Sequence, residues 1–416
     1  MGCRIDSPFL DSGSYMGESE FRNKVTWYNF ILSLLVVLIH AVNLAPSNGI
    51  LQERIREMAA GGASGVALLP YRIEDFFSNG LAQAAVPGFF LMAGYLFYRT
   101  LHGFSDIRRK WQERFWSILI PYCAWNTIYY LLYVLIGRAR FSLSGLSEAA
   151  AQYTYNPVFW YIYQLIILTF LAPMLTLVLR RTWFGKIFLI AVFTYLAAGH
   201  SFPALNADAL FYYSVGAYLA MQSNTSFIKA SWNSPKEADS ILDEIQYEKK
   251  RTTWFEENHP LAGLIMLLAA AALTTLTVSF FNAHISGPAL IAILPEATVT
   301  WLFSSGGQSA IAVAQRTLLA LGFFLILPGE KLPSAEPYLQ NTFLLYTIHF
   351  PIVRLIFHML YRLSASTAPA TIVAGSWLCL MIYFLLPPFC CFAAYWIKKF
   401  LKKFCPKAGN LLLGGR

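Results

Sequence analysis

Long apolar stretches alternate with short polar segments along this chain. A helix needs roughly 20 predominantly apolar residues to cross a bilayer, and several of the stretches reach that length. Gly, Pro and charged residues gather between them, as they do in turns and loops. The pattern therefore predicts a bundle of about ten transmembrane helices. The predicted spans are residues 27–46, 83–101, 115–137, 157–179, 185–200, 207–223, 260–281, 308–328, 341–361 and 372–397.

Composition places the chain in the all-α integral membrane class. Of its 416 residues, 57% are hydrophobic and only 13% are charged, a balance typical of polytopic membrane proteins. The polar segments outside the spans are too short to form a core of their own. We interpret them as an N-terminal tail at 1–26, a linker at 224–258 and a basic tail at 401–416, around a membrane domain at 27–400.

Lysines and arginines predict the orientation, because positively charged loops stay in the cytoplasm. Most of the 31 basic residues fall in the two tails and in the connections that follow the even-numbered spans. The opposite connections carry only Arg54, Arg56, Arg72, Arg138, Arg140 and Arg362. This distribution predicts that both termini lie in the cytoplasm. Because the charge is spread over many loops, we expect contact with the lipid bilayer and no binding of nucleic acid.

One semi-apolar stretch, at 288–303, is not counted as a span. Pro295 and Glu296 interrupt it, and a crossing there would invert every later helix and place the basic C-terminal tail outside. We therefore predict an outer re-entrant or interfacial segment at 283–307. The six cysteines show no zinc-site spacing with a histidine, so we expect no metal site.

The most informative polar residue is His40, which stands deep in the first apolar stretch. A titratable group at membrane depth costs free energy, so it needs a partner or a task. Counting about 1.5 Å per residue from the cytoplasmic end places His40 roughly 16 Å beyond Asn29, in the outer half of the bilayer. Later spans place His349, Arg354 and Arg316 at similar depth. If these faces converge, they line an outward-opening polar cavity; separately, each is a helix-packing partner.

A basic group precedes the third span, in RRKWQERFW at 108–116. Arginines at the inner mouth of a bundle suit the phosphates of a nucleotide carrier, although positive-inside topology alone also explains them. A cytoplasmic anion site below an outer histidine suits a group that is transferred across the bilayer. A transporter or exporter is the alternative, with His349 and Arg354 as proton-relay or substrate residues. A catalytically inactive scaffolding protein is a third interpretation.

Six short motifs follow one another along the spans. They are VVLIH at 36–40, AVPGFFLMAGYLF at 85–97, RFWSILIPY at 114–122, FWYIYQLIILTFLAPML at 159–175, FYYSVGAYLA at 211–220 and FLLYTIHFPI at 343–352. In this order they resemble the motifs of the acyltransferase 3 family, which are integral membrane O-acyltransferases. The resemblance covers most of the chain.

The resemblance implies transfer of an acyl group, usually acetyl, from cytoplasmic acyl-CoA to a hydroxyl of a cell-surface polysaccharide or lipid-linked sugar. It also implies a multi-pass protein of the bacterial inner or plasma membrane. His40 would be the catalytic residue, since imidazole with its near-neutral pKa can take a proton from a sugar hydroxyl. Whether it also carries the acyl group as a nucleophile is left open.

The resemblance also suggests binding residues. Candidates for acyl-CoA are Arg108, Arg109, Arg114, Tyr122 and, at the inner end of the first span, Asn29. The family commonly has an arginine where this chain has Asn29, so the contact there loses a charge. We expect acyl-CoA as a co-substrate and no permanently bound cofactor. Candidates for the acceptor are Trp160, Gln164, Arg316, His349 and Arg354.

Overall fold

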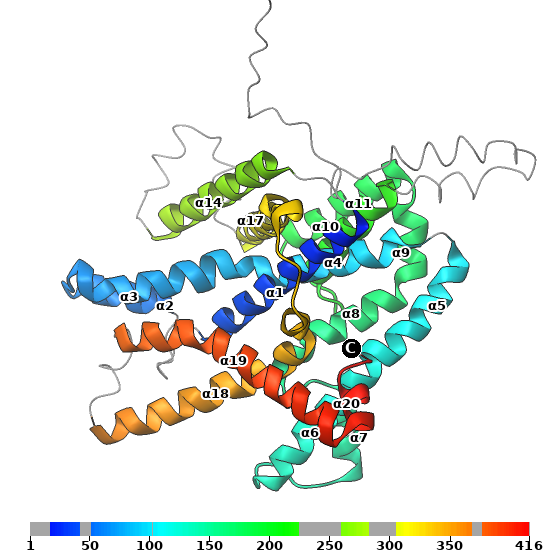
Figure 1. The fold of residues 1–416 in the computed structure, drawn as a ribbon. Coiled ribbons are helices and arrows are strands. Elements are labelled where there is room, and N and C mark those ends of the chain that lie inside the picture. Colours follow the sequence, from blue (N-terminus) through cyan, green and yellow to red (C-terminus); the bar gives the residue numbers. More distant parts are fainter. Residues whose placement is uncertain are drawn as a thin grey trace, which may run out of the picture.

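The computed structural model describes residues 17–41, 51–101, 103–223, 259–282, 305–367 and 377–415, and over these ranges it contains helices and no strands (Figure 1). The first half contains α1 (Glu18–Ala41), α2 (Leu51–Ala60), α3 (Gly65–Asp75), α4 (Ala85–Arg99), α5 (Phe104–Arg114), α6 (Ile120–Leu135), α7 (Leu143–Ala151), α8 (Trp160–Phe170) and α9 (Ala172–Leu179). The second contains α10 (Thr182–Ala197), α11 (Ala207–Ser223), α14 (Pro260–Asn282), α17 (Ser305–Ile326), α18 (Thr342–Thr367), α19 (Trp377–Phe404) and α20 (Pro406–Leu412).

Short 3₁₀- and π-helical turns join several of these helices. Two are π-helical, η1 (Phe76–Gly80) and η3 (Phe115–Leu119), and they make α3–α4 and α5–α6 nearly continuous. The 3₁₀ turns are η2 (Leu81–Ala84), η4 (Pro157–Phe159), η6 (Gly329–Lys331) and η7 (Pro337–Gln340). Single π-turns inside helices often occur at functional sites.

Each of the ten predicted spans overlaps a helix, but not all are long. In the described residues, six helices are long and apolar enough to cross a membrane, and α8 with α9 makes a seventh if the pair, bent by 64°, counts as one span. Pro173 near the start of α9 explains the bend, because proline lacks the amide hydrogen that would continue the helix. The shorter helices are α10, α11 and the described apolar part of α14. The count of ten and the orientation of the termini therefore stay predictions.

Several predicted boundaries move. Helix α1 begins at Glu18 and not at 27, and its first turn is fixed by an ion pair of 2.6 Å between Glu18 and Arg99 at the end of α4. The predicted linker at 224–258 lies outside the described residues, as do the N-terminal residues 1–16 and most of the predicted outer segment at 283–307.

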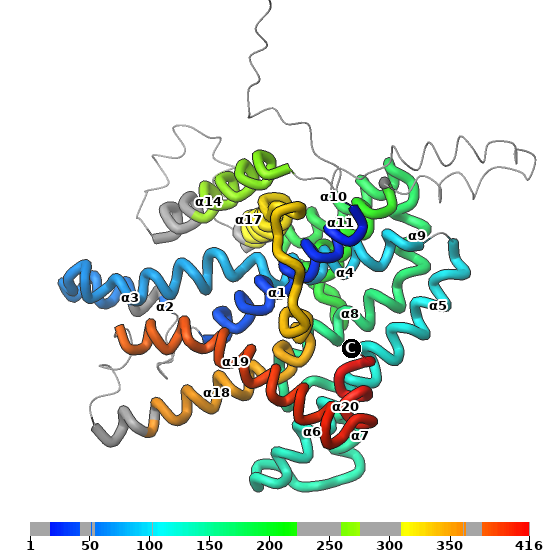
Figure 2. Tube along the Cα trace, in the orientation of Figure 1, coloured from blue at the N-terminus to red at the C-terminus, as the bar shows by residue number. Residues whose placement is uncertain are grey.

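The described part of the C-terminal tail is packed against the bundle (Figure 2). Helix α20 lies on α6, where the indole nitrogen of Trp125 donates a hydrogen bond of 3.0 Å to the Leu412 carbonyl. Leu412 and Leu413 are buried in the core there. The basic residues of 401–415 thus belong to a segment that is anchored by its leucines.

Helix α1 contributes side chains to both of the larger apolar clusters formed by the described residues. Its first half packs into a cluster with α4, α9, α10, α11 and α17, and its last turn packs into a second cluster with α6, α18, α19 and α20. Contact between α4 and α11 depends on Gly94 and Gly216, where an added methyl group would overlap the backbone of the other helix. Small residues allow such close approach in membrane bundles. His40 lies in the last turn of α1, next to the second cluster.

Candidate functional site

The last turn of α1, which carries His40, is tied to two neighbouring elements. The Ser78 hydroxyl, in η1, donates to the Leu38 carbonyl at 3.1 Å and lies 2.6 Å from the Tyr383 hydroxyl of α19. Ser78 and Tyr383 are both buried. The first bond joins α1 to η1 two residues before His40, and the second joins η1 to α19. The half-buried His40 ring is therefore held on a fixed helix end.

His349, from α18, is the partner that the fold brings to His40. The two ring centroids lie 5.3 Å apart, with the planes inclined by 40°. His349 is fully buried, and its Nδ1 lies 2.7 Å from the carbonyl oxygen of Tyr346 and 3.3 Å from that of Leu345. A carbonyl only accepts hydrogen bonds, so in the neutral ring Nδ1 carries the proton. His349 Nε2 has no hydrogen-bond partner among the described residues.

A proline inside α18 explains how this helix is anchored beside His349. Pro351 has no amide hydrogen for the carbonyl of Thr347, four residues before it. The Tyr129 hydroxyl and the Asn156 side-chain amide take its place, at 2.7 and 3.2 Å from that oxygen. The helix is thereby joined to α6 and to the residue before η4. The Tyr346 hydroxyl also bonds to the Val158 carbonyl in η4.

The Phe350 ring separates Arg354 from His40. The edge of the Phe350 ring meets His40 at a centroid distance of 5.3 Å, and the Arg354 guanidinium stands 5.8 Å from the Phe350 centroid. Arg354 is exposed, as is His358 further along α18. Two of the predicted intramembrane groups, His40 and His349, therefore meet directly, and Arg354 lies next to them.

Arg316 is placed elsewhere. Its guanidinium lies 4.0 Å from the carboxylate of Asp208, at the start of α11, and both side chains are about one-third exposed, 34% and 36%. Asp208 is not among the residues that the sequence analysis singled out. This pair is a contact that the sequence did not predict, and the assignment of Arg316 to the acceptor stays a prediction.

Two further sequence candidates hold structural hydrogen bonds, and a third packs against an aromatic ring. The Gln164 amide donates to the Ala204 carbonyl at 3.2 Å and accepts from the Asn206 backbone at 2.8 Å. The Tyr122 hydroxyl donates to the carbonyl of Ala151, the last residue of α7, at 3.1 Å. These contacts join α8 to the loop before α11, and α6 to α7. The Trp160 ring on α8 packs against the Phe90 ring of α4, with the ring centroids 6.0 Å apart.

The basic stretch of α5 faces outward and carries its own counter-charges. Arg109 lies 3.2 Å from Asp106 and 3.9 Å from Glu113, one helical turn on either side. Arg108 and Arg109 are exposed. Lys110, by contrast, is buried and donates to the Thr100 hydroxyl at 2.8 Å. The exposed arginines of α5 are accessible to an anionic ligand.

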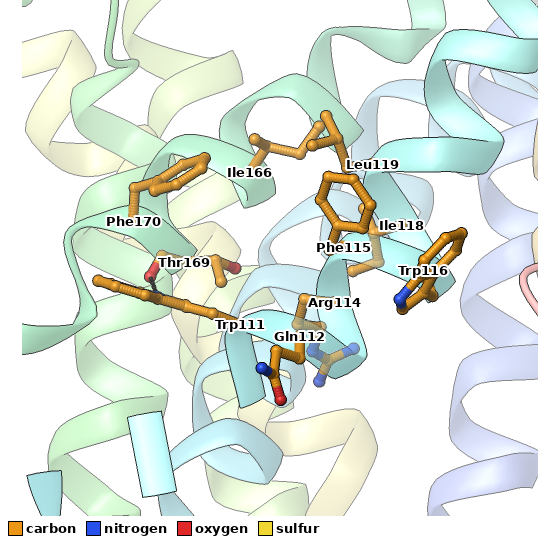
Figure 3. A pocket seen from close by; sticks show the side chains of 10 residues that line it. All are labelled: Trp111, Gln112, Arg114, Phe115, Trp116, Ile118, Leu119, Ile166, Thr169 and Phe170. Carbon is orange, nitrogen blue, oxygen red and sulfur yellow. Dashed lines mark hydrogen bonds between the residues drawn. The ribbon is translucent and has the colours of Figure 1, made fainter. Parts of the chain in front are cut away.

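An apolar cavity of about 340 Å³ adjoins this stretch, between η3 and α8 (Figure 3). Its lining is mostly aromatic and aliphatic and consists of Trp111, Gln112, Arg114, Phe115, Trp116, Ile118, Leu119, Ile166, Thr169 and Phe170. One wall is fixed by the Trp111 indole, which donates to the Thr169 carbonyl at 2.7 Å. In Figure 3, Arg114 and Gln112 lie at one end and Ile166 and Leu119 at the other. A cation thus stands at the edge of an apolar groove.

In the first half of α1, the polar residues before Asn29 already have partners. Asn23 bonds through its side chain to the backbone of Leu332, Pro333 and Ala335, beside η6. Lys24 is buried, with its ammonium 4.7 Å from the centroid of a ring on α17. Asn29 itself is half-buried.

Comparison with known proteins decides the family. A family model described as an acyltransferase domain, Acyl_transf_3, matches residues 26–397, which is most of the chain. The chain belongs to the acyltransferase 3 family. Comparison with curated proteins and with solved structures gave no match. Together with the long apolar helices, family membership makes this a multi-pass membrane acyltransferase.

In this acyltransferase 3 protein, the sequence motifs are packing partners. The motif at 85–97 forms α4 and the motif at 211–220 lies in α11, and these two helices meet at Gly94 and Gly216. The motifs that contain His40 and His349 meet at the histidine pair. Short motifs spread over the sequence therefore converge in two places in the fold.

Sequence reasoning missed several polar residues of this acyltransferase. Asn126 on α6 is 1% exposed and Asn156 is fully buried, and both amide atoms of Asn126 and the Asn156 Oδ1 have no partner among the described residues. Asn126 lies four residues after Tyr122 and three before Tyr129, so all three share one face of α6. The sequence did contain a signal for Asn126, because a polar asparagine within an apolar, aromatic-rich span costs free energy. Ser78 and Tyr383 had no such signal.

Proposed function

We propose that this membrane acyltransferase transfers an acetyl group from acyl-CoA to a hydroxyl of a cell-surface polysaccharide or lipid-linked sugar, with His40 as general base. One observation carries the proposal: in a family of acyltransferases, the histidine of the first span lies on a fixed helix end, half-buried, against a second histidine. Neutral imidazole at a site that excludes most water is suited to accept a hydroxyl proton.

The reaction needs only one proton carrier. The acceptor hydroxyl oxygen bonds to the thioester carbonyl carbon while its proton passes to His40. The C–S bond then breaks, and the departing thiolate takes that proton and leaves as the free thiol of CoA. The products are the sugar ester and CoA, and His40 returns to its neutral form.

The acyl-CoA site is assigned to the basic stretch and the groove beside it. Arg108, Arg109 and Arg114 provide guanidinium groups for the CoA phosphates, which arginine binds in bidentate geometry. Asn29, in place of the family arginine, offers amide hydrogen bonds. In this assignment both termini and α5 lie on the cytoplasmic side of the bacterial cell membrane, where acyl-CoA is present.

The acceptor site is assigned to the region around the histidine pair. Arg354 lies beyond Phe350 and is exposed, so it can meet an anionic or hydroxylated sugar that approaches His40. Gln164, Trp160 and Arg316 are assigned to the approach of the acceptor at the same outer side. Tyr122, whose hydroxyl bonds to the Ala151 carbonyl, is assigned to acyl-CoA with the arginines.

The decisive test is an assay of the purified protein in liposomes. Acetyl-CoA is supplied with surface polysaccharide or lipid-linked oligosaccharide from the producing cell, and both the CoA released and the acetyl ester formed are measured. Wild-type protein is expected to form both, and His40→Ala neither. His358→Ala is the matched control, because this histidine is exposed on α18 and outside the assigned sites. Equal acetylation by wild type and His40→Ala contradicts the proposal.

A further inference from the structure

The two nitrogens of the His349 ring have opposite environments. Nδ1 is turned toward its own helix and bonds the Tyr346 and Leu345 carbonyls. Nε2 lies on the other edge of the ring, away from that backbone, and has no partner among the described residues although the side chain is fully buried. Its lone pair is therefore available, because the proton is already committed to Nδ1.

A buried acceptor without a partner costs about 1–3 kcal/mol, so its retention calls for a donor that is present at some stage of function. In the described part of the chain, His40 is the one ring from another helix that contacts His349. A neutral imidazole has one N–H to donate. His40 is thus the available donor to His349 Nε2.

We propose that His349 is a positioning residue, whose Nε2 accepts the N–H of His40 and so leaves the other nitrogen of His40 free to act as the base. This inference rests on the proposed function. Active-site bases are generally oriented by a third group that fixes their tautomer, and here a second histidine, itself fixed by a backbone carbonyl, takes that place.

The surroundings make the pair rigid from both sides. On the α18 side, the Thr347 carbonyl released by Pro351 is bound by Tyr129 and Asn156. On the α1 side, Ser78 bonds the Leu38 carbonyl two residues before His40. Positioning of a base requires such support, because small displacements of catalytic groups cost rate.

Three variants test the proposal in the liposome assay. His349→Phe keeps the ring volume and removes the acceptor, and we expect kcat to fall by about 100-fold or more with KM for acetyl-CoA changed little. His349→Gln keeps an acceptor near the Nε2 position and should recover most of the lost kcat. Tyr346→Phe is the control, because it removes a neighbouring hydroxyl but leaves the backbone carbonyl that orients His349.

The resting protein provides a second readout. Nitrogen NMR of histidine-labelled protein in nanodiscs reports which nitrogen of His40 is protonated, with the His40 signal identified by its loss in His40→Asn. We expect one tautomer in wild type and in His349→Gln, and a mixture of two in His349→Phe. Thermal unfolding of each variant shows whether it is folded.

The outcomes separate this inference from the proposed function. Unchanged kcat and unchanged His40 tautomer in folded His349→Phe overturn the positioning role while the acyltransferase assignment stands. A rate loss that His349→Gln does not recover, with no change of tautomer, also overturns it. Wild-type protein that shows the single tautomer but releases no CoA overturns the proposed function, and the hydrogen-bonded pair remains.

Discussion

The histidine pair and the basic stretch of α5 are both polar regions of a largely apolar protein, yet they are constructed in opposite ways. His349 is fully buried and fixed by a backbone carbonyl, with His40 against it. Arg109 is exposed and lies near two carboxylates of its own helix. Buried hydrogen bonds are strong because water does not compete, whereas exposed ion pairs contribute little. Proton transfer suits the first environment, and reversible capture of a soluble anion suits the second.

The largest effect is expected at the buried pair. His40→Asn should lower kcat by about 10²- to 10⁴-fold, the usual contribution of a general base, with little change in KM for acetyl-CoA. Steady-state release of CoA in the liposome assay measures both parameters. A change in KM alone would place His40 in substrate binding and remove the contrast between the two regions.

The basic stretch should show the reverse pattern. Replacing Arg108, Arg109 and Arg114 together by Gln should raise KM for acetyl-CoA about 10- to 100-fold, as the loss of one or two charge-assisted hydrogen bonds predicts, and leave kcat at saturation unchanged. The corresponding triple Lys variant retains the charge, and its KM for acetyl-CoA should lie between that of wild type and that of the Gln variant. If the Gln variant keeps wild-type KM, these arginines serve membrane topology only.

Ionic strength distinguishes the two regions without mutation. Salt screens exposed charges over about 10 Å at 0.1 M and affects buried groups much less. Raising the salt concentration from about 0.05 M to about 0.5 M should therefore increase KM for acetyl-CoA several-fold and leave kcat almost constant. A salt-sensitive kcat together with a constant KM would show that the exposed stretch does not contact the donor.

The smallest effect is expected at the two buried asparagines. Asn126→Leu removes two buried polar atoms that have no partner among the described residues, so the melting temperature should stay constant or rise slightly. Asn156→Leu removes the bond to the Thr347 carbonyl and should destabilise the protein by about 1 kcal/mol. Thermal unfolding in detergent compares the two. A marked loss of stability in Asn126→Leu would mean that this amide is paired in the folded protein.

Much of the secondary structure could be predicted from the apolar pattern alone. All ten predicted spans overlap helices, because roughly 20 apolar residues in a row favour a helix in a membrane. Exact boundaries could not be predicted, since α1 starts at Glu18 through an ion pair with Arg99, a residue far along the chain. The bend between α8 and α9 had a local signal in Pro173.

The candidate site was predictable in part. His40 and His349 stood out because titratable residues are costly in apolar spans. Arg316 stood out for the same reason, but the ion pair that it makes with Asp208 was not predicted. Depth along a helix can be counted from the sequence, whereas the direction in which a side chain faces around the bundle depends on how each helix is rotated.

The sequence by itself determined that the protein lies in a membrane, that it is helical, that it carries the family motifs and that His40 stands in an apolar span. These properties follow from the order of apolar and polar residues along one segment. Only the tertiary structure decided which polar groups meet. The contact between His40 and His349 joins helices at opposite ends of the chain. It is supported by the hydrogen bonds to the carbonyl released by Pro351 and by the packing of α1 against both clusters. Each of these is a relation between segments, which no single stretch of sequence encodes.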